Sequence, residues 1–251
     1  MLGYTPSRRS GFDHSIRHVV GLSGGKDSTA LALRLAEVEP RDYTYICTPT
    51  GHELDSMLAW WDRLEVILGK PLVRITNHGR TLTDLINIHN ALPNNRQRWC
   101  TRQLKIEPTI AWCVRNAPVK LYVGLRVDED EQEGIYGDLV HSDFPFRRWG
   151  WGIGNVWDYL ESKGLADCIP IRTDCYDCYD QKIREWWALW KHHPDLFEQA
   201  CQQEDRTGHT FRSPTRDTWP ASLCEMAKEF ASGRKIIGGV EPRTACRVCS
   251  L

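Results

Sequence analysis

An apolar run leads directly into a glycine-rich turn at residues 18–28, which read His18-Val19-Val20-Gly21-Leu22-Ser23-Gly24-Gly25-Lys26-Asp27-Ser28. Residues 18–22 are typical of a buried β-strand, and the helical spacing of the leucines after the turn predicts that a helix begins there. Glycine lets the backbone approach a ligand closely, and the amides at a helix start favour an anion. Residues 23–28 therefore indicate a phosphate-binding loop between a strand and a helix.

The chain on the C-terminal side of this loop alternates between strand and helix patterns up to about residue 125. Strands are predicted at 43–47, 72–75 and 120–125, and helices at 54–68 and 106–113. Such alternation is typical of a doubly wound parallel sheet with helices on both faces, in which ligands bind at the carboxyl ends of the strands. We expect one nucleotide-binding domain over residues 1–150 and a smaller helical, cysteine-bearing part over residues 151–251.

Composition excludes several classes of protein. The 251 residues carry 32 Lys+Arg and 33 Asp+Glu, a net charge of −1, so the surface has no wholesale basic coat for nucleic acid. No run of 18 apolar residues predicts a membrane span, and the N-terminal residues do not resemble a secretory signal. We therefore expect a cytoplasmic protein with no membrane partner, whose ten cysteines are kept reduced and serve a metal or sulfur chemistry.

Four motifs resemble one superfamily. Ser23–Ser28 is similar to the signature loop of the PP-loop ATP pyrophosphatases, also called adenine nucleotide alpha hydrolases. Thr50-Gly51-His52-Glu53, residues 99–108 and residues 124–129 resemble segments of its phosphoadenosine phosphosulfate (PAPS) reductase-like branch. The similarity covers roughly residues 17–200, and it implies an HUP-like nucleotide-binding fold.

The resemblance also implies the roles of individual residues. ATP would bind with its pyrophosphate on the loop and with Mg²⁺, and the bond at its α-phosphate would break. The family match implies cofactor-binding roles for Ser23, Gly24, Gly25, Lys26, Asp27, Ser28, Gly51, Glu53 and Arg126, with Lys26 and Asp27 catalytic. Sulfonucleotide reductases usually lack the Lys-Asp pair, so its presence here favours ATP cleavage.

The cysteines form two C-x-x-C pairs, Cys175/Cys178 and Cys246/Cys249. Such pairs suit a metal ion, and two of them suit a structural zinc. Resemblance to adenylylsulfate reductases implies instead a 4Fe–4S cluster on Cys100, Cys175 and Cys178. The fourth ligand is then Cys249, with Cys246, Cys168 or an open iron position as alternatives.

The function expected is ATP-dependent adenylation of a substrate followed by sulfur transfer, with a nucleic acid or a small metabolite as acceptor. A cysteine desulfurase or free sulfide would donate the sulfur, and a homodimer is possible. Two alternatives stay open: a PAPS or adenylylsulfate reductase that uses Cys246 or Cys249 as nucleophile, and a non-catalytic binding protein with structural zinc. Near Cys100 the basic residues Arg96, Arg98, Arg102 and Lys105 either bind phosphate groups or form a solvated helix start.

Overall fold

The computed structural model describes residues 16–130 and 136–237. Their strands form one sheet in the order β3-β2-β1-β4-β5, and every neighbouring pair is parallel. The strands are β1 (Arg17–Gly21), β2 (Tyr43–Cys47), β3 (Leu72–Arg74), β4 (Val119–Tyr122) and β5 (His141–Asp143). The predicted doubly wound α/β fold is confirmed, because helices flank this parallel sheet.

The strand order places the functional edge of the sheet. From β1 the chain moves outward through β2 to β3, then crosses back to place β4 on the other side of β1. The direction of winding thus reverses between β1 and β4. Ligands of doubly wound sheets bind in the crevice outside the carboxyl ends of the strands at such a reversal. The turn at residues 22–28 follows β1 and residues 123–129 follow β4, so both segments lie at the edge where this rule places a ligand.

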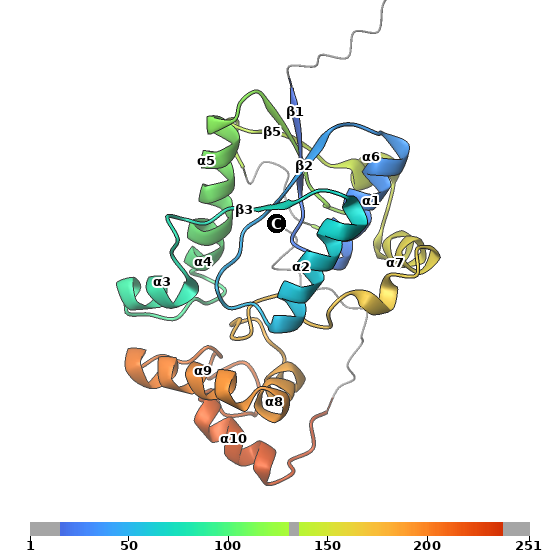
Figure 1. Ribbon diagram of the computed structural model, residues 1–251. Helices are drawn as coiled ribbons and strands as arrows, with labels where there is room; N and C mark the ends of the chain where they lie inside the picture. The colour runs from blue at the N-terminus through green and yellow to red at the C-terminus, as the bar shows by residue number, and fades with distance from the viewer. Residues whose placement is uncertain (1–15, 131–135, 238–251) are drawn as a thin grey trace, which may run out of the picture.

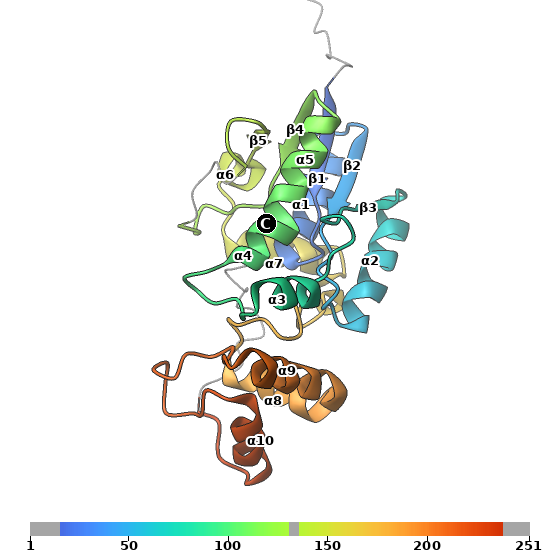
Figure 2. The same cartoon turned by 90° about the vertical axis from the view of Figure 1, so that its left-hand side faces the viewer.

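Two core clusters cover opposite faces of the sheet. Val20 packs with helices α1 (Lys26–Val38), α2 (Asp55–Leu68) and α7 (Ile153–Ser162), whereas Val19 packs with α5 (Glu107–Arg115). Successive strand residues point to opposite faces, which explains why neighbours in β1 enter different clusters. Figures 1 and 2 show α1 and α2 on one side of the sheet and α5 on the other.

A third core cluster forms around Trp186, which is fully buried against Phe197 and Phe211. It is built from α8 (Ile183–His192), α9 (Pro194–Thr207) and α10 (Leu223–Ala231), together with α3 (Leu82–His89) of the sheet domain. Both views place these three helices beyond the carboxyl ends of the strands (Figures 1 and 2). The remaining elements are α4 (Trp99–Thr101), the π-helix η1 (Arg102–Ile106), α6 (Pro145–Trp149) and the 3₁₀ helix η2 (Ala166–Cys168).

The boundary expected near residue 150 stays a prediction. Val156 and Leu160 of α7 pack in the same core cluster as α1, so residues shortly after 150 cover the sheet. Within the described ranges no helix is long and apolar enough to cross a membrane.

Candidate functional site

The turn after β1 is held by its own serines. Ser23 Oγ and Ser28 Oγ are 3.0 Å apart, the Gly24 amide donates to Ser28 Oγ at 3.1 Å, and Ser28 Oγ donates to the Gly25 carbonyl at 3.2 Å. These bonds tie the start of the turn to the first turn of α1. The sequence expectation of a strand, a glycine-rich turn and a helix start is confirmed here.

Two tryptophans of α2 fix the outside of the turn. Trp60 Nε1 donates to the Gly24 carbonyl and Trp61 Nε1 donates to the Ser23 carbonyl, each at 2.8 Å. Gly24 has φ +87°, and a Cβ at this position would lie 2.2 Å from Met57 Cε. Only glycine fits, because both the left-handed backbone and the packing exclude a side chain. The sequence predicts a helix over residues 54–68 but does not indicate the indole bonds.

Lys26, Asp27 and Arg126 form a buried ionic network between the ends of β1 and β4. Lys26 Nζ lies 2.5 Å from Asp27 Oδ2, and Arg126 Nη1 lies 2.7 Å from Asp27 Oδ1. All three residues are less than a tenth exposed. Burial lowers the pKa of Lys26, and the Asp27 charge opposes that shift. The structure thus brings together three residues that the family match predicted as site residues.

Asp27 and Arg126 hold each other as a buried ion pair. Asp27 Oδ1 and Arg126 Nη1 lie 2.7 Å apart, and neither atom has a further hydrogen-bond partner among the described residues. A charged ligand that binds here would compete for these two groups. A phosphate oxygen would accept from Arg126, and a cation would be held by Asp27.

Further carboxylates orient Arg126. Arg126 Nε pairs with Asp128 at 2.9 Å and Nη2 pairs with Glu129 at 3.1 Å. Asp128 also accepts from the Ile153 amide, and Arg147 donates to the Glu129 carbonyl at 3.0 Å. The family match indicated residues 124–129 as a site segment, but nothing in the sequence indicated the part of Arg147.

The turn after β2 is shaped by Glu53. Its carboxylate accepts from the amide and the hydroxyl of Thr50, both at 2.7 Å, and from the amide of Gly51 at 3.0 Å. Gly51 has φ +79°, and a Cβ there would lie 2.7 Å from Thr81 Cγ2. Glu53 therefore holds its own turn, and the roles expected for Gly51 and Glu53 toward adenosine stay predictions.

A buried histidine joins this turn to the C-x-x-C loop. His52 Nδ1 lies 2.8 Å from Asp177 Oδ2 and Nε2 lies 2.8 Å from Thr83 Oγ1, while the ring stacks on Tyr176 with centroids 4.8 Å apart. Burial lowers the pKa of His52, but Asp177 and the carboxylates of Glu53 and Asp84 raise it by more, so the net shift is upward. Sequence analysis gave no role to His52 or Asp177.

The C-x-x-C loop lies directly against the predicted nucleotide site. Cys175 Sγ is 3.2 Å from Thr50 Oγ1, and a Cβ placed on Gly25 would lie 3.5 Å from Thr173 Oγ1. Burial raises the pKa of the Cys175 thiol well above its usual range, and the charge of Lys105 partly opposes this. Residues 173–178 thus meet both the turn after β1 and the turn after β2.

The cysteine ligands predicted for a metal are only partly brought together. Cys100, Cys175 and Cys178 belong to one core cluster, and Cys100 Sγ lies 4.0 Å from Thr101 Oγ1. Within residues 16–130 and 136–237 no three His, Cys, Asp or Glu side chains gather closely enough to hold a metal ion. Cys246 and Cys249 lie outside the described residues. The ligand set therefore stays a prediction.

Comparisons with known proteins rest on structure. No family model and no curated protein sequence matches the chain. A PAPS reductase from Candida auris, solved as a phosphate complex, is similar with 13% identity and a TM-score of 0.48, over 61% of this chain and 74% of that one. An NH3-dependent NAD synthetase from Campylobacter jejuni, solved with nitrate, has 14% identity and a TM-score of 0.41, and the match covers 76% of this chain and 84% of that one. At TM-scores below 0.5 these two likenesses add nothing to the fold shown by the sheet topology.

The packing around Gly24 predicts the effect of a single methyl group. We expect Gly24→Ala to lower the free energy of unfolding by about 1–3 kcal/mol, because the Cβ overlaps Met57 and Trp61 at a positive φ. Urea denaturation measures this change. The control is Gly154→Ala, since a Cβ on that helical glycine meets no atom within 4 Å. A Gly24→Ala protein as stable as the control would contradict the geometry.

The pair His52–Asp177 predicts a pH-dependent contribution to stability. The pKa of His52 is raised in the folded protein, so the contribution is fully present below about pH 6.5 and declines as the pH rises through the raised value. We expect Asp177→Asn to cost about 3 kcal/mol at pH 5.5 and less at pH 9, measured by urea denaturation. Asp158→Asn, at an exposed position, is the control. A cost that grows with pH would show that the protonated histidine is not what Asp177 stabilises.

Proposed function

We propose that this protein is a PP-loop ATP pyrophosphatase of the PAPS reductase-like branch, and that it adenylates a substrate. The observation that carries the proposal is the buried network of Lys26, Asp27 and Arg126 in the crevice between β1 and β4, beside the serine-held turn. Two buried cations beside amides at a helix start form a site suited to the phosphates of a nucleotide.

Binding of ATP would exchange partners within this network. The side chain of Lys26 is held by Asp27, and burial already disfavours its charged form, so a phosphate oxygen is a strong alternative partner. Arg126 Nη1, which lies 2.7 Å from Asp27 Oδ1, would turn to a second oxygen. The pyrophosphate would thus sit against residues 23–28, and the α-phosphate would face the open crevice, where a substrate oxygen attacks.

Binding of ATP at this site would require a cation in addition to Lys26 and Arg126. Arg126 and Lys26 already face the carboxylates of Asp27, Asp128 and Glu129, so an incoming triphosphate adds negative charge to an occupied network. Mg²⁺ is commonly held by one or two carboxylates together with substrate phosphates. Asp27 fits this role, because its buried carboxylate would lose the cationic partners Lys26 and Arg126 to the phosphates. The ion would neutralise charge that develops on the leaving pyrophosphate.

The second half-reaction we propose is sulfur transfer. The acceptor oxygen would attack the α-phosphorus of ATP, and the bond between the α-phosphorus and pyrophosphate would break. A sulfur nucleophile would then attack the adenylated carbon of the acceptor, and AMP would leave with the acceptor oxygen. Support comes from the C-x-x-C loop, which places Cys175 at the turn after β2 and Thr173 beside Gly25. Thiols therefore lie at the edge where the adenylated intermediate would form.

The iron–sulfur part of the proposal has a direct test. Iron, zinc and acid-labile sulfide would be measured on anaerobically purified protein. About four irons and four sulfides per chain assign the cluster and leave Cys249, Cys246, Cys168 or an open iron position for its fourth site, whereas about one zinc makes the cysteines structural.

The adenylation step predicts the effect of removing Lys26. We expect Lys26→Ala to slow substrate-stimulated pyrophosphate release by roughly 10²–10³-fold, because a charge aimed at the leaving group is lost. The measurement is pyrophosphate release from ATP with RNA, DNA and small-metabolite pools as acceptors. Lys191→Ala, an exposed lysine at the end of α8, is the control and should behave as wild type.

Two results would contradict adenylation. Sulfite formation from PAPS with thioredoxin and without ATP would assign the protein as a reductase. Failure of every acceptor to stimulate pyrophosphate release, with Lys26→Ala changing only ATP binding, would leave a nucleotide-binding protein without turnover.

A further inference from the structure

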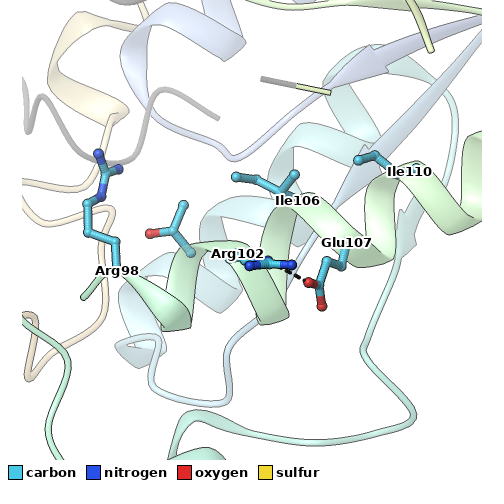
Figure 3. Close-up of a pocket in the computed structure, with 6 residues that line it drawn as sticks. Arg98, Arg102, Ile106, Glu107 and Ile110 are labelled. Carbon is cyan, nitrogen blue, oxygen red and sulfur yellow. Dashed lines mark hydrogen bonds and ion pairs between the residues drawn. The ribbon is translucent and has the colours of Figure 1, made fainter. Parts of the chain in front are cut away.

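A cavity of about 480 Å³ lies along α4, η1 and α5. Its lining residues are Arg98, Thr101, Arg102, Ile106, Glu107 and Ile110. Figure 3 shows the side chains of Arg98, Ile106 and Ile110 pointing to one side of this helical segment, with Arg102 turned toward Glu107. The volume lies in the range of small-molecule pockets, roughly 300–1,000 Å³.

The lining combines two kinds of recognition. Arg98 and Arg102 provide guanidinium groups, which bind phosphate oxygens through paired N–H donors. Ile106 and Ile110 provide an apolar wall farther along the helix, against which a flat ring can pack. From residue 98 to residue 110 a helix rises roughly 18 Å, so the cavity is longer than a single phosphate group. A ligand that joins a phosphate to an apolar ring matches this arrangement.

The carboxylate of Glu107 limits how much negative charge the cavity accepts. Arg102 Nε pairs with Glu107 at 2.8 Å, so a carboxylate lies beside this guanidinium. A triphosphate would meet Glu107 and be repelled, whereas a phosphodiester carries a single negative charge. The lining therefore favours a nucleotide within a strand over free ATP.

The backbone at the cavity is unusual. Residues Arg102–Ile106 form a π-helix, in which the Glu107 amide donates to the Arg102 carbonyl. Turns of π-helix are rare and frequently occur at functional sites, because the inserted residue re-aims the side chains around it. Here the π-helix begins at Arg102 and ends at Ile106, which places one basic and one apolar lining residue at its two ends.

The same segment reaches the proposed reaction site. Thr101 lines the cavity and lies beside Cys100, and the charge of Lys105 acts on the thiol of Cys175. A strand anchored at the cavity would therefore extend toward the thiols at the carboxyl edge of the sheet. We propose that this cavity binds a phosphodiester and its base in a single-stranded nucleic acid, which is the acceptor. This assignment rests on the proposed function.

Binding of a short fluorescein-labelled oligothymidylate, followed by anisotropy on the full chain, tests the proposal. A non-hydrolysable ATP analogue at saturation keeps the strand out of the nucleotide site. We expect Arg98→Ala and Arg102→Ala each to weaken binding roughly tenfold and to reduce the salt slope by about 0.7. Glu107→Gln should strengthen binding roughly threefold, because it removes the opposing charge. Arg115→Ala, an exposed arginine on α5 outside the lining, should bind as wild type.

The named outcomes separate this proposal from the function on which it rests. The cavity proposal is overturned if the Arg98→Ala/Arg102→Ala variant binds the oligothymidylate as tightly as wild type. It is also overturned if Arg115→Ala weakens binding as much as the cavity variants do, or if Glu107→Gln weakens binding. Thymidine monophosphate and inorganic phosphate are tested as competitors of the labelled strand. If either competes as well as unlabelled strand does, the cavity binds a free phosphate and the proposal of a nucleic-acid strand is overturned. Strand binding without pyrophosphate release leaves the cavity assignment standing and contradicts only adenylation.

Discussion

The arrangement of the segments that follow β1 and β4 depends on the buried carboxylate of Asp27. It lies in the first turn of α1, yet its two oxygens face Lys26 and Arg126, which come from opposite sides of the point where the sheet reverses direction. A buried carboxylate without cationic partners costs several kcal/mol, so the ends of β1 and β4 must stay in register for these contacts to exist. Gly124 follows from the same constraint, because a Cβ there would lie 3.3 Å from the backbone of Asp27.

A second polar link attaches the helical part to this edge. His52 and Asp177 are almost completely buried, and the Tyr176 amide donates to the His52 carbonyl at 2.8 Å. Charge, stacking and a backbone bond thus act on the same three residues. If the C-x-x-C loop left the turn after β2, the buried ion pair between His52 and Asp177 would be broken. Docking of this loop, rather than nearness in sequence, brings Cys175 to the proposed nucleotide site.

The segment from residue 98 to residue 110 lies between the C-x-x-C loop and the cavity lined by Arg98, Arg102 and Ile106. It passes Cys100, directs the charge of Lys105 at Cys175, and lines the cavity with arginine and isoleucine side chains. A π-helix in this segment changes which side chains share a face. Nucleotide activation, thiol placement and strand binding are therefore proposed for one continuous edge of the molecule.

The sequence by itself determined the order of the strands up to β4, the helices α1, α2 and α5, and the position of the loop at residues 23–28, because apolar periodicity and glycine placement are local properties of the chain. It did not predict β5, since His141, Ser142 and Asp143 form a short edge strand without an apolar pattern. Nor did it predict α3, whose start depends on the capping box of Thr81 and Asp84.

Only the tertiary structure decided which distant residues meet. The indoles of Trp60 and Trp61 on the turn after β1, Arg147 on Glu129, and Asp177 on His52 join segments between 18 and 125 residues apart. Such pairings depend on the strand order and on the docking of the C-x-x-C loop, and neither is encoded in any local pattern. The position of the turn after β1 could be derived from the chain, whereas its partners follow from how the sheet and the helices pack.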